Sequence, residues 1–245
     1  MVLVLSLFPG IGLLDMAFEE EGFCVVRGPD LLWGGDIRRF HPPAGKFDGV
    51  IGGPPCQAFS RLRHIAIAQG HAIAPNLIPE FERVLDEARP GWFVMENVPD
   101  APTPRQAESS ALLRDFDCGG LTSRLRRFSW AGVALDLPPV TRSPGALPSV
   151  TCDARVTPVA IGGSGKRKGQ RGQQGGIAPH EGAHLMLGEM LRRQGFAPGL
   201  LDGAPFTLTG KRAAVGNGVP LPMGRTVAQA VKAAMDTPTR AVVGD

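Results

Sequence analysis

The feature that most constrains the fold is a short apolar run that stops at four turn-forming residues and a cysteine. Residues 47–51 are Phe-Asp-Gly-Val-Ile, and Gly-Gly-Pro-Pro-Cys follows them, ending at Cys56. A short apolar run between turn formers predicts a buried strand. Ligands of open α/β sheets bind at the carboxyl ends of the strands. Because prolines restrict the backbone, we expect Cys56 to be held firmly at such an end, although a buried, inert cysteine in a turn fits the same pattern.

The chain begins with a similar arrangement. Residues 2–8 form a near-continuous apolar run, which predicts the first, central strand of a parallel sheet. Gly10 and Gly12 mark the turn after it, and residues 13–21 predict a helix that ends at Gly22. A strand, a glycine turn and a helix form a nucleotide-binding arrangement, because glycines let a ligand approach the backbone at a helix N-terminus. This spacing alone does not separate a nucleotide site from an ordinary turn.

Acidic residues follow two further predicted strands. Residues 23–26 predict a strand, and Asp30 follows it where nucleotide-binding units place a carboxylate for ribose hydroxyls. A solvated turn aspartate is the alternative. Residues 92–95 predict a buried strand that ends at Glu96, and a carboxylate emerging from an apolar run should have a raised pKa. Helices are predicted over residues 76–88, 181–194 and 226–235.

Composition limits the class of protein. The chain of 245 residues is 43% hydrophobic, which fits one well-buried α/β domain with a small appendage. A net charge of +3 is compatible with a nucleic-acid partner. The four cysteines contain no Cys-x-x-Cys pair, so we expect no metal site, no disulfide framework and a cytoplasmic location. No apolar run is long enough for a membrane span, and the start lacks the basic leader of a signal peptide.

Several motifs together resemble the cytosine-5 DNA methyltransferases. Pro-Pro-Cys-Gln at 54–57, followed by Phe59-Ser60, resembles the nucleophile motif of that family. Six further segments resemble other family motifs in the same order: residues 8–15, 34–37, 96–98, 122–128, 194–196 and 215–220. Two departures stand out, since the family usually has an acidic residue where Ser6 stands and a glutamine where Thr122 stands. The chain is therefore identified as a member of this family, of the compact prokaryotic or phage type.

The resemblance implies a fold and a domain organisation. The expected fold is α/β, a doubly wound, Rossmann-like S-adenosylmethionine-dependent methyltransferase domain with a small inserted target-recognition region. Residues 1–137 would bind the cofactor and carry catalysis, residues 138–205 would form the recognition region, and residues 206–245 would return to the catalytic domain. The interval from Asp30 to Asp36 leaves no room for a full helix and strand, so either the sheet is trimmed here or the role expected for Asp30 is wrong.

The resemblance also implies a reaction. Methyl transfer from S-adenosylmethionine to carbon 5 of a flipped cytosine would pass through a covalent adduct of Cys56 with carbon 6. Glu96 would hold a proton toward ring nitrogen 3, and Arg126, with Arg124 behind it, would bind the 2-oxygen. The implied cofactor-binding residues are Phe8, Gly10, Gly12, Leu13, Asp30, Asp36, Ile37, Pro54, Leu77, Asn217 and Val219.

Double-stranded DNA is the implied partner. Arg61 and Arg63, with His64 nearby, are placed to meet phosphate. Residues 162–176 are rich in glycine and glutamine and carry Lys166, Arg167, Lys168 and Arg171, which predicts either DNA contact or an ordinary surface loop. We expect a monomer, with a cognate restriction nuclease as a conceivable partner.

Three alternatives stay open at this point. The chain could modify cytosine in RNA, it could be a non-catalytic relative that binds DNA or cofactor, or it could transfer a group other than methyl. The recognised DNA sequence, the oligomeric state, the host and the effect of Thr122 cannot be read from the sequence.

Overall fold

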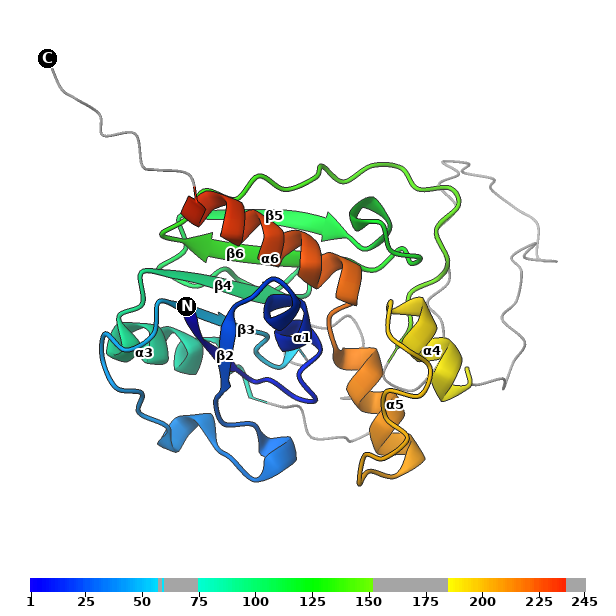
Figure 1. The fold of residues 1–245 in the computed structure, drawn as a ribbon, viewed down its shortest axis with the longest axis horizontal. Coiled ribbons are helices and arrows are strands. Elements are labelled where there is room, and N and C mark those ends of the chain that lie inside the picture. Colours follow the sequence, from blue (N-terminus) through cyan, green and yellow to red (C-terminus); the bar gives the residue numbers. More distant parts are fainter. Residues whose placement is uncertain (57–58, 60–74, 152–184, 237–245) are drawn as a thin grey trace, which may run out of the picture.

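The computed structural model describes residues 1–56, 59, 75–151 and 185–236. They form a six-stranded sheet in the order β2-β1-β3-β4-β6-β5, with helices packed against it (Figure 1). The strands are β1 (Leu3–Leu7), β2 (Cys24–Arg27), β3 (Gly49–Gly52), β4 (Trp92–Asn97), β5 (Ser109–Arg114) and β6 (Leu125–Ala131). The helices are α1 (Leu13–Glu20), α3 (Ile78–Ala88), α4 (Leu187–Arg193), α5 (Leu208–Asn217) and α6 (Leu221–Asp236).

Helices cover both faces of the sheet. Neighbouring residues of a strand point to opposite faces, so two consecutive residues of β1 pack against different helices. Val4 packs in a cluster with Phe18 of α1 and Val227 of α6, whereas the next residue, Leu5, packs with Phe81 of α3. Strands with both faces covered read as near-continuous apolar runs, which is the pattern of residues 2–8 and 47–51. The predicted doubly wound α/β fold is confirmed.

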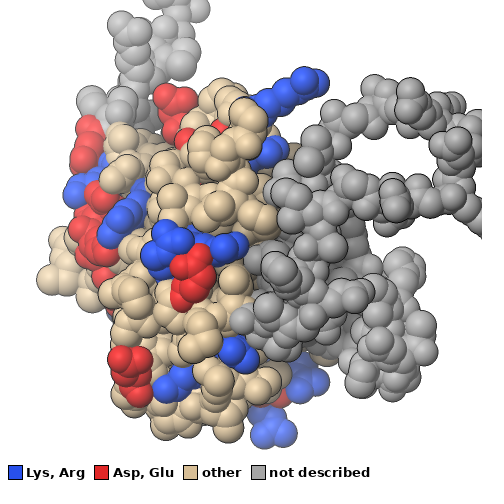
Figure 2. Space-filling view, turned by 90° about the vertical axis from the view of Figure 1, so that its right-hand side faces the viewer, with Lys and Arg blue, Asp and Glu red and all other residues tan. Residues whose placement is uncertain are grey.

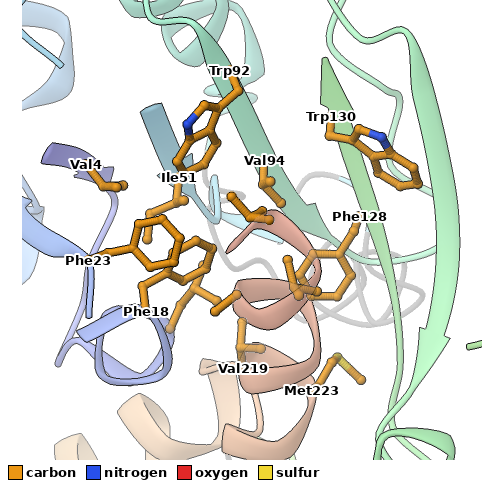
Figure 3. Close-up of a cluster of buried hydrophobic side chains, with 14 of the residues drawn as sticks. Val4, Phe18, Phe23, Ile51, Trp92, Val94, Phe128, Trp130, Val219 and Met223 are labelled. Atoms are coloured by element: carbon orange, nitrogen blue, oxygen red, sulfur yellow. The ribbon is translucent and has the colours of Figure 1, made fainter. Parts of the chain in front are cut away.

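Aromatic rings fill the face covered by α1 and α6 (Figure 3). The ring of Phe18 lies 5.2 Å from that of Phe23 and 6.3 Å from that of Trp92, measured between centroids. Gly49 gives Trp92 its room, since a Cβ at this glycine would lie 2.2 Å from the indole ring. The strand in front of the cysteine motif therefore needs glycine for packing.

A third apolar cluster joins the later part of the chain to α1. It contains Leu13, Val150, Leu191 and Val215, which come from α1, the segment after β6, α4 and α5. The backbone N–H of Leu221 donates to the carbonyl oxygen of Gln194, which ties the start of α6 to the end of α4. Val150 and α4, which lie within the range 138–205, are thus packed against α1.

Most predicted elements are present, with some differences. β4 runs on through Asn97, so Glu96 lies inside the strand and does not follow it. α6 begins at Leu221, five residues before the predicted start, because Pro222 is tolerated in a first helical turn. α4 covers only Leu187–Arg193, and part of its predicted range lies outside the described residues. Neither β5 nor α5 was predicted from the sequence.

The sheet is parallel only in part. β1, β2, β3 and β4 are parallel, but β6 is antiparallel to both β4 and β5. A short connection, with the 3-10 turn η4 (Phe116–Cys118), links β5 to β6, and short connections can join only antiparallel strands. Between β2 and β3 the structure has the 3-10 turns η1 (Leu31–Trp33) and η2 (Ile37–Arg39) in place of a helix and a strand. The sheet is therefore trimmed between Asp30 and Asp36.

None of the helices in the described ranges combines the length and the apolar character needed to cross a membrane.

Candidate active site

One cavity of about 480 Å³ lies where β1, β3 and β4 reach their carboxyl ends. Its lining joins the two sets of residues that the sequence assigns to catalysis and to cofactor binding. The lining includes Cys56, Glu96, Arg126, Phe8, Gly10, Leu13, Asp30, Asp36, Ile37, Pro54, Leu77, Asn217 and Val219. Two of the expected residues, Gly12 and Arg124, do not line it.

The glycine turn after β1 is held from both sides at Gly10. Its N–H donates to Asp30 Oδ2 over 2.8 Å, and its carbonyl oxygen accepts from Trp33 Nε1 over 2.7 Å. Gly10 has a φ of 56°, and a Cβ added to it would meet no other atom within 4 Å, so its face toward the cavity is open. Phe8 also has a φ of 56°, which costs energy for a residue with a side chain and is typical of functional sites.

Gly12 has a different reason to be glycine. It caps α1 with a φ of 80°, and a Cβ here would lie 2.8 Å from Arg27 Nη2. Arg27 in turn donates to the buried carboxylate of Asp15 over 2.9 Å. The expected direct cofactor contact at Gly12 is thus not supported by its position, because the residue packs under Arg27 beside the cavity.

Asp15 supplies a carboxylate next to Ser6, where the family pattern places an acidic residue on the strand. Ser6 Oγ donates to Asp15 Oδ1 over 2.5 Å, and both residues line the cavity. Burial raises the pKa of Asp15, whereas the hydrogen bonds from Ser6 and Arg27 lower it. Ser6 stands where the family usually has an acidic residue, and the carboxylate of Asp15 in α1 lies beside it.

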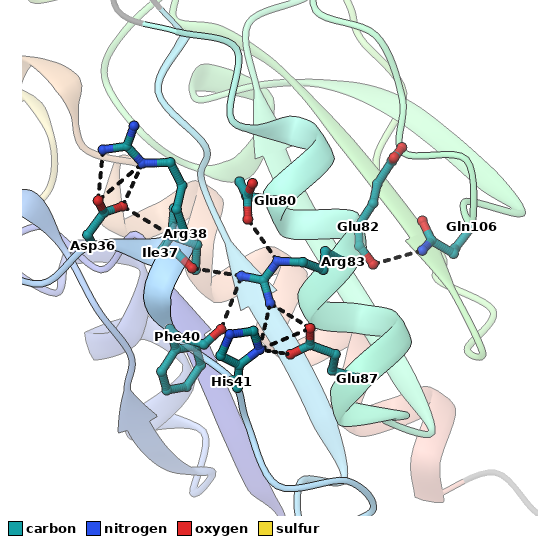
Figure 4. Close-up of polar contacts among 10 residues, drawn as sticks. All are labelled: Asp36, Ile37, Arg38, Phe40, His41, Glu80, Glu82, Arg83, Glu87 and Gln106. Carbon is teal, nitrogen blue, oxygen red and sulfur yellow. Dashed lines mark hydrogen bonds and ion pairs between the residues drawn. The ribbon is translucent and has the colours of Figure 1, made fainter.

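Asp36 and Ile37 form a wall of the cavity that is anchored to α3 (Figure 4). Arg83 of α3 donates to the carbonyl oxygens of Ile37, over 2.7 Å, and Phe40, over 3.1 Å. Asp36 accepts from the side chain and the backbone N–H of Arg38, and these bonds hold the pKa of Asp36 below its ordinary value. Arg38 also lines the cavity, and no sequence motif pointed to it.

Asn97 fixes the loop that carries the cysteine. Its Nδ2 donates to the carbonyl oxygen of Pro54 over 3.1 Å, and the Asn97 side chain is 1% exposed as part of β4. A Cβ at Gly53 would lie 3.1 Å from Glu96 Oε2, so the loop passes close to the carboxylate. The motif over residues 96–98 therefore has two parts, a carboxylate for the cavity and an amide for the cysteine loop.

Glu96 and Arg126 form an ion pair in the lining of the cavity. Arg126 Nε lies 2.8 Å from Glu96 Oε1, and the two residues come from the neighbouring antiparallel strands β4 and β6. Burial raises the pKa of Glu96, against the charges of Arg126 and Arg124, which is the direction that the sequence predicts. A carboxyl group of this kind can hold a proton and release it inside the cavity.

The pKa of the Cys56 thiol depends on its burial and on the charges of its neighbours. Burial raises the pKa of Cys56, and the negative charge of Glu96 raises it further. The positive charges of Arg126 and Arg124 lower it. A proton on Glu96 would therefore favour the Cys56 thiolate, because it removes the nearby negative charge.

Arg124 is buried and does not line the cavity. Its side chain is 3% exposed and donates from Nη1 to the carbonyl oxygen of Val150 and from Nη2 to that of Gly216, each over 2.9 Å. It lies behind Arg126, as expected, but both outer nitrogens bind main-chain oxygens outside the cavity. Its position supports a positioning role and not a contact with substrate.

Thr122 stabilises the turn between β5 and β6. Its Oγ1 and its N–H both donate to Asp115 Oδ2, over 2.6 Å and 2.9 Å. The residue that stands where the family has glutamine is 1% exposed and forms part of this turn.

The expected DNA contacts at Arg61, Arg63, Lys166, Arg167, Lys168 and Arg171 lie outside the described residues. On the face drawn in Figure 2, the described Lys and Arg side chains lie among Asp and Glu side chains and do not gather in one patch.

Comparison with known proteins finds one family model that matches part of the chain. Residues 34–117 match the family model of the C-5 cytosine-specific DNA methylases. Among curated proteins, the chain is 33% identical to the Type II methyltransferase M.NgoPII of Neisseria gonorrhoeae over 55% of this chain and 41% of that protein. It is 32% identical to M.FnuDI of Fusobacterium nucleatum over 48% of this chain and 38% of that protein. The chain spans less than half the length of these curated relatives.

Solved structures share the fold over nearly the whole chain. One is a putative DNA modification methyltransferase encoded within an Escherichia coli prophage, with a TM-score of 0.62, 15% identity, and coverage of 97% of this chain and 100% of that chain. Another is the Entamoeba histolytica methyltransferase EhMeth, with a TM-score of 0.59, 13% identity, and coverage of 97% and 99%. At these identities the likeness shows the fold alone.

Proposed function

Since residues 34–117 belong to the C-5 cytosine-specific DNA methylase family, we propose that the chain transfers a methyl group from S-adenosylmethionine to carbon 5 of cytosine in DNA. One observation carries the proposal: Cys56, Glu96 and Arg126 share a single cavity with the residues expected to bind the cofactor. A methyl donor bound by one set of residues and a cytosine bound by the other would therefore lie in the same cavity.

The cavity fits the proposed cofactor. Phe8, Leu13, Ile37 and Leu77 give apolar walls suited to a flat base, and the open face of Gly10 lets a ligand approach the backbone. Asp30 would hold ribose hydroxyls with oxygens that already accept from the N–H groups of Gly10 and Leu32. When bound, S-adenosylmethionine supplies a methyl group activated by its positively charged sulfur.

The residues of the chain would activate the base. Carbon 5 of cytosine is a poor nucleophile, and addition of the Cys56 thiolate to carbon 6 makes it enamine-like. Glu96 would hold its proton at ring nitrogen 3, where negative charge develops. Arg126 would bind the 2-oxygen while its contact with Glu96 Oε1 keeps that carboxyl group in place. Release of the carbon 5 proton and of Cys56 restores the aromatic ring.

The proposal extends to substrate form and partners. A stacked base cannot reach a buried thiol, so the cytosine would be flipped out of duplex DNA. Arg61, Arg63, Lys166, Arg167, Lys168 and Arg171 remain proposed phosphate contacts. A monomer, a cognate restriction nuclease and a cytoplasmic location also remain proposals, as does the division at residues 137 and 205.

Replacing Asp36 with alanine should weaken S-adenosylmethionine binding by about 1–3 kcal/mol, the usual effect of leaving a polar partner unsatisfied. Asp30→Ala should weaken it at least as much, because Asp30 also holds the N–H of Gly10. Isothermal titration calorimetry measures both. Asp86→Ala is the control, since Asp86 lies on the exposed side of α3 and pairs with Arg105. Unchanged affinity in Asp36→Ala would remove this residue from the cofactor site.

Bisulfite sequencing of DNA from cells expressing the chain tests the proposed function. The expected result is cytosine methylation at one short recurring sequence, absent from cells that express Cys56→Ala. Labelled methyl transfer to duplex DNA and to tRNA then separates the two substrates. Transfer to tRNA alone would replace the DNA proposal with an RNA methyltransferase, and binding without transfer to either would support a non-catalytic relative.

A further inference from the structure

One wall of the cavity belongs to no strand of the six-stranded sheet. Asp36, Ile37 and Arg38 all line the cavity, and the 3-10 turn η2 carries them where the sheet is trimmed between β2 and β3. Within the turn, the N–H of Phe40 donates to the carbonyl oxygen of Ile37 over 3.1 Å. A single 3-10 turn forms few hydrogen bonds of its own, so the position of this wall depends on contacts with other elements.

Arg83 of α3 supplies such contacts, and every nitrogen of its side chain donates (Figure 4). Nη2 donates to the carbonyl oxygens of Ile37 and Phe40, over 2.7 Å and 3.1 Å. Nε donates to Glu80 over 2.8 Å, and Nη1 donates to Glu87 over 2.7 Å. Both carboxylates lie on α3 itself, one turn before and one turn after Arg83. Because the helix already holds the guanidinium, little further side-chain entropy is lost when it binds the turn.

Apolar contacts join the same turn to the start of α3. Ile37 is 3% exposed and packs in one cluster with Leu77, Ile78 and Phe81. Leu77 precedes the first residue of the helix and lines the cavity together with Ile37. Apolar contacts are not directional, whereas hydrogen bonds are. The two bonds from Arg83 therefore define how the turn is oriented on α3.

A second arginine next to α3 provides a comparison. Arg105 contacts Glu82 and Asp86, two other carboxylates of α3, but its side chain is 61% exposed. The side chain of Arg83 is 28% exposed, although it carries the same charge. Of these two arginines, Arg83 is the one whose guanidinium reaches the turn at the cavity wall.

We propose that Arg83 is a positioning residue of the cofactor site, which holds Asp36 and Ile37 where they bind S-adenosylmethionine. The inference rests on the proposed function, because it takes these two residues as cofactor contacts. Arg83 itself does not line the cavity. Without Arg83 the wall should be correctly placed in a smaller fraction of molecules, and the affinity for a ligand falls in proportion to that fraction. Once the cofactor is bound the wall is in place, so the chemical step should change little.

The first test measures the Kd of S-adenosylhomocysteine by calorimetry. Methionine has a helix propensity close to that of arginine but cannot donate, so Arg83→Met removes the bonds and keeps the helix. Its Kd should rise about tenfold, which corresponds to about 1.4 kcal/mol. In Arg83→Lys one ammonium group replaces the fork, and the Kd should lie between those of the wild type and Arg83→Met. In methyl transfer to duplex DNA, KM for S-adenosylmethionine should rise while kcat stays close to the wild-type value.

Amide hydrogen exchange without ligand tests whether the effect passes through the wall. The N–H groups of Arg39 and Phe40 donate to the carbonyl oxygens of Asp36 and Ile37. In Arg83→Met the peptide that covers residues 36–40 should exchange faster than in the wild type, because the turn opens more often. Peptides from β1 should exchange at the wild-type rate.

Arg105→Met is the matched control, because it removes an arginine from the other acidic pair of α3. It should keep the wild-type Kd and the wild-type exchange at residues 36–40. Thermal unfolding identifies a variant that does not fold, and Arg83→Lys carries the test if Arg83→Met fails. An unchanged Kd in the folded variants, or a higher Kd without faster exchange at residues 36–40, overturns the positioning role. If the wild-type chain does not bind S-adenosylhomocysteine, the proposed cofactor and this inference are both wrong.

Discussion

Replacing Cys56 with alanine should reduce methyl transfer to the background level. Without the thiolate, nothing adds to carbon 6, and carbon 5 of cytosine stays unreactive toward the methyl donor. The Cys56 side chain lies at one part of the cavity, whereas the proposed cofactor contacts come mainly from other segments, so binding of S-adenosylmethionine should change little. Transfer of labelled methyl groups to duplex DNA measures the rate, and calorimetry measures the cofactor affinity.

Cys118→Ala is the control for the loss of a thiol elsewhere. Cys118 belongs to the turn η4, and burial raises the pKa of this thiol to about 11. Its replacement should leave methyl transfer near the wild-type rate. Substantial transfer by Cys56→Ala would show that the reaction does not use this nucleophile, even if DNA methylation itself were observed.

Replacing Glu96 with glutamine should slow methyl transfer by about 10²–10⁴-fold, the usual contribution of a positioned proton donor. Glutamine keeps the size of the side chain and can donate an N–H to ring nitrogen 3, but it cannot give up a proton. The same change removes the negative charge that raises the pKa of Cys56. The thiol should therefore become more reactive toward a small alkylating agent while the enzyme becomes slower.

This opposite response separates a catalytic role of Glu96 from a structural one. The rate of alkylation of the Cys56 peptide by iodoacetamide, followed by mass spectrometry across pH, gives the shift of its pKa. A downward shift together with slow transfer is expected. Slow transfer with an unchanged or higher pKa would instead point to a displaced cysteine loop, since Asn97, the neighbour of Glu96, holds the Pro54 carbonyl oxygen.

The fold was largely predictable because its central strands, β1, β3 and β4, are buried on both faces. Residues 2–8 and 92–95 are apolar runs that end at turns, and they form β1 and most of β4. The antiparallel direction of β6 was not predictable in this way, because the pattern of apolar residues in a strand does not depend on whether it runs parallel or antiparallel to its neighbour. α5 was missed because its sequence holds two glycines and two basic residues, and its stability comes from packing of Val215 and from the bonds of Arg124 and Gln194.

The candidate site was predictable where a motif carries the side chain that faces the cavity. Cys56, Glu96 and Arg126 come from such motifs, and the structure brings them together. Supporting residues were missed. Trp33 holds Gly10 from a turn with no motif, and the bond between Ser6 and Asp15 was not expected, although Asp15 belongs to the motif over residues 8–15. Such contacts join segments that are distant in the sequence, so no local pattern indicates them.

The central claim is that Cys56 forms a covalent bond to the target cytosine during methyl transfer. The direct test incubates the chain and S-adenosylmethionine with duplex DNA in which the target cytosine carries fluorine at carbon 5. After methyl transfer no proton can leave carbon 5, so Cys56 should stay bound to carbon 6. A denaturation-resistant complex, with mass spectrometry placing the DNA on the Cys56 peptide, is the predicted result. Methyl transfer to unmodified DNA without such a complex on the fluorinated duplex would contradict the account.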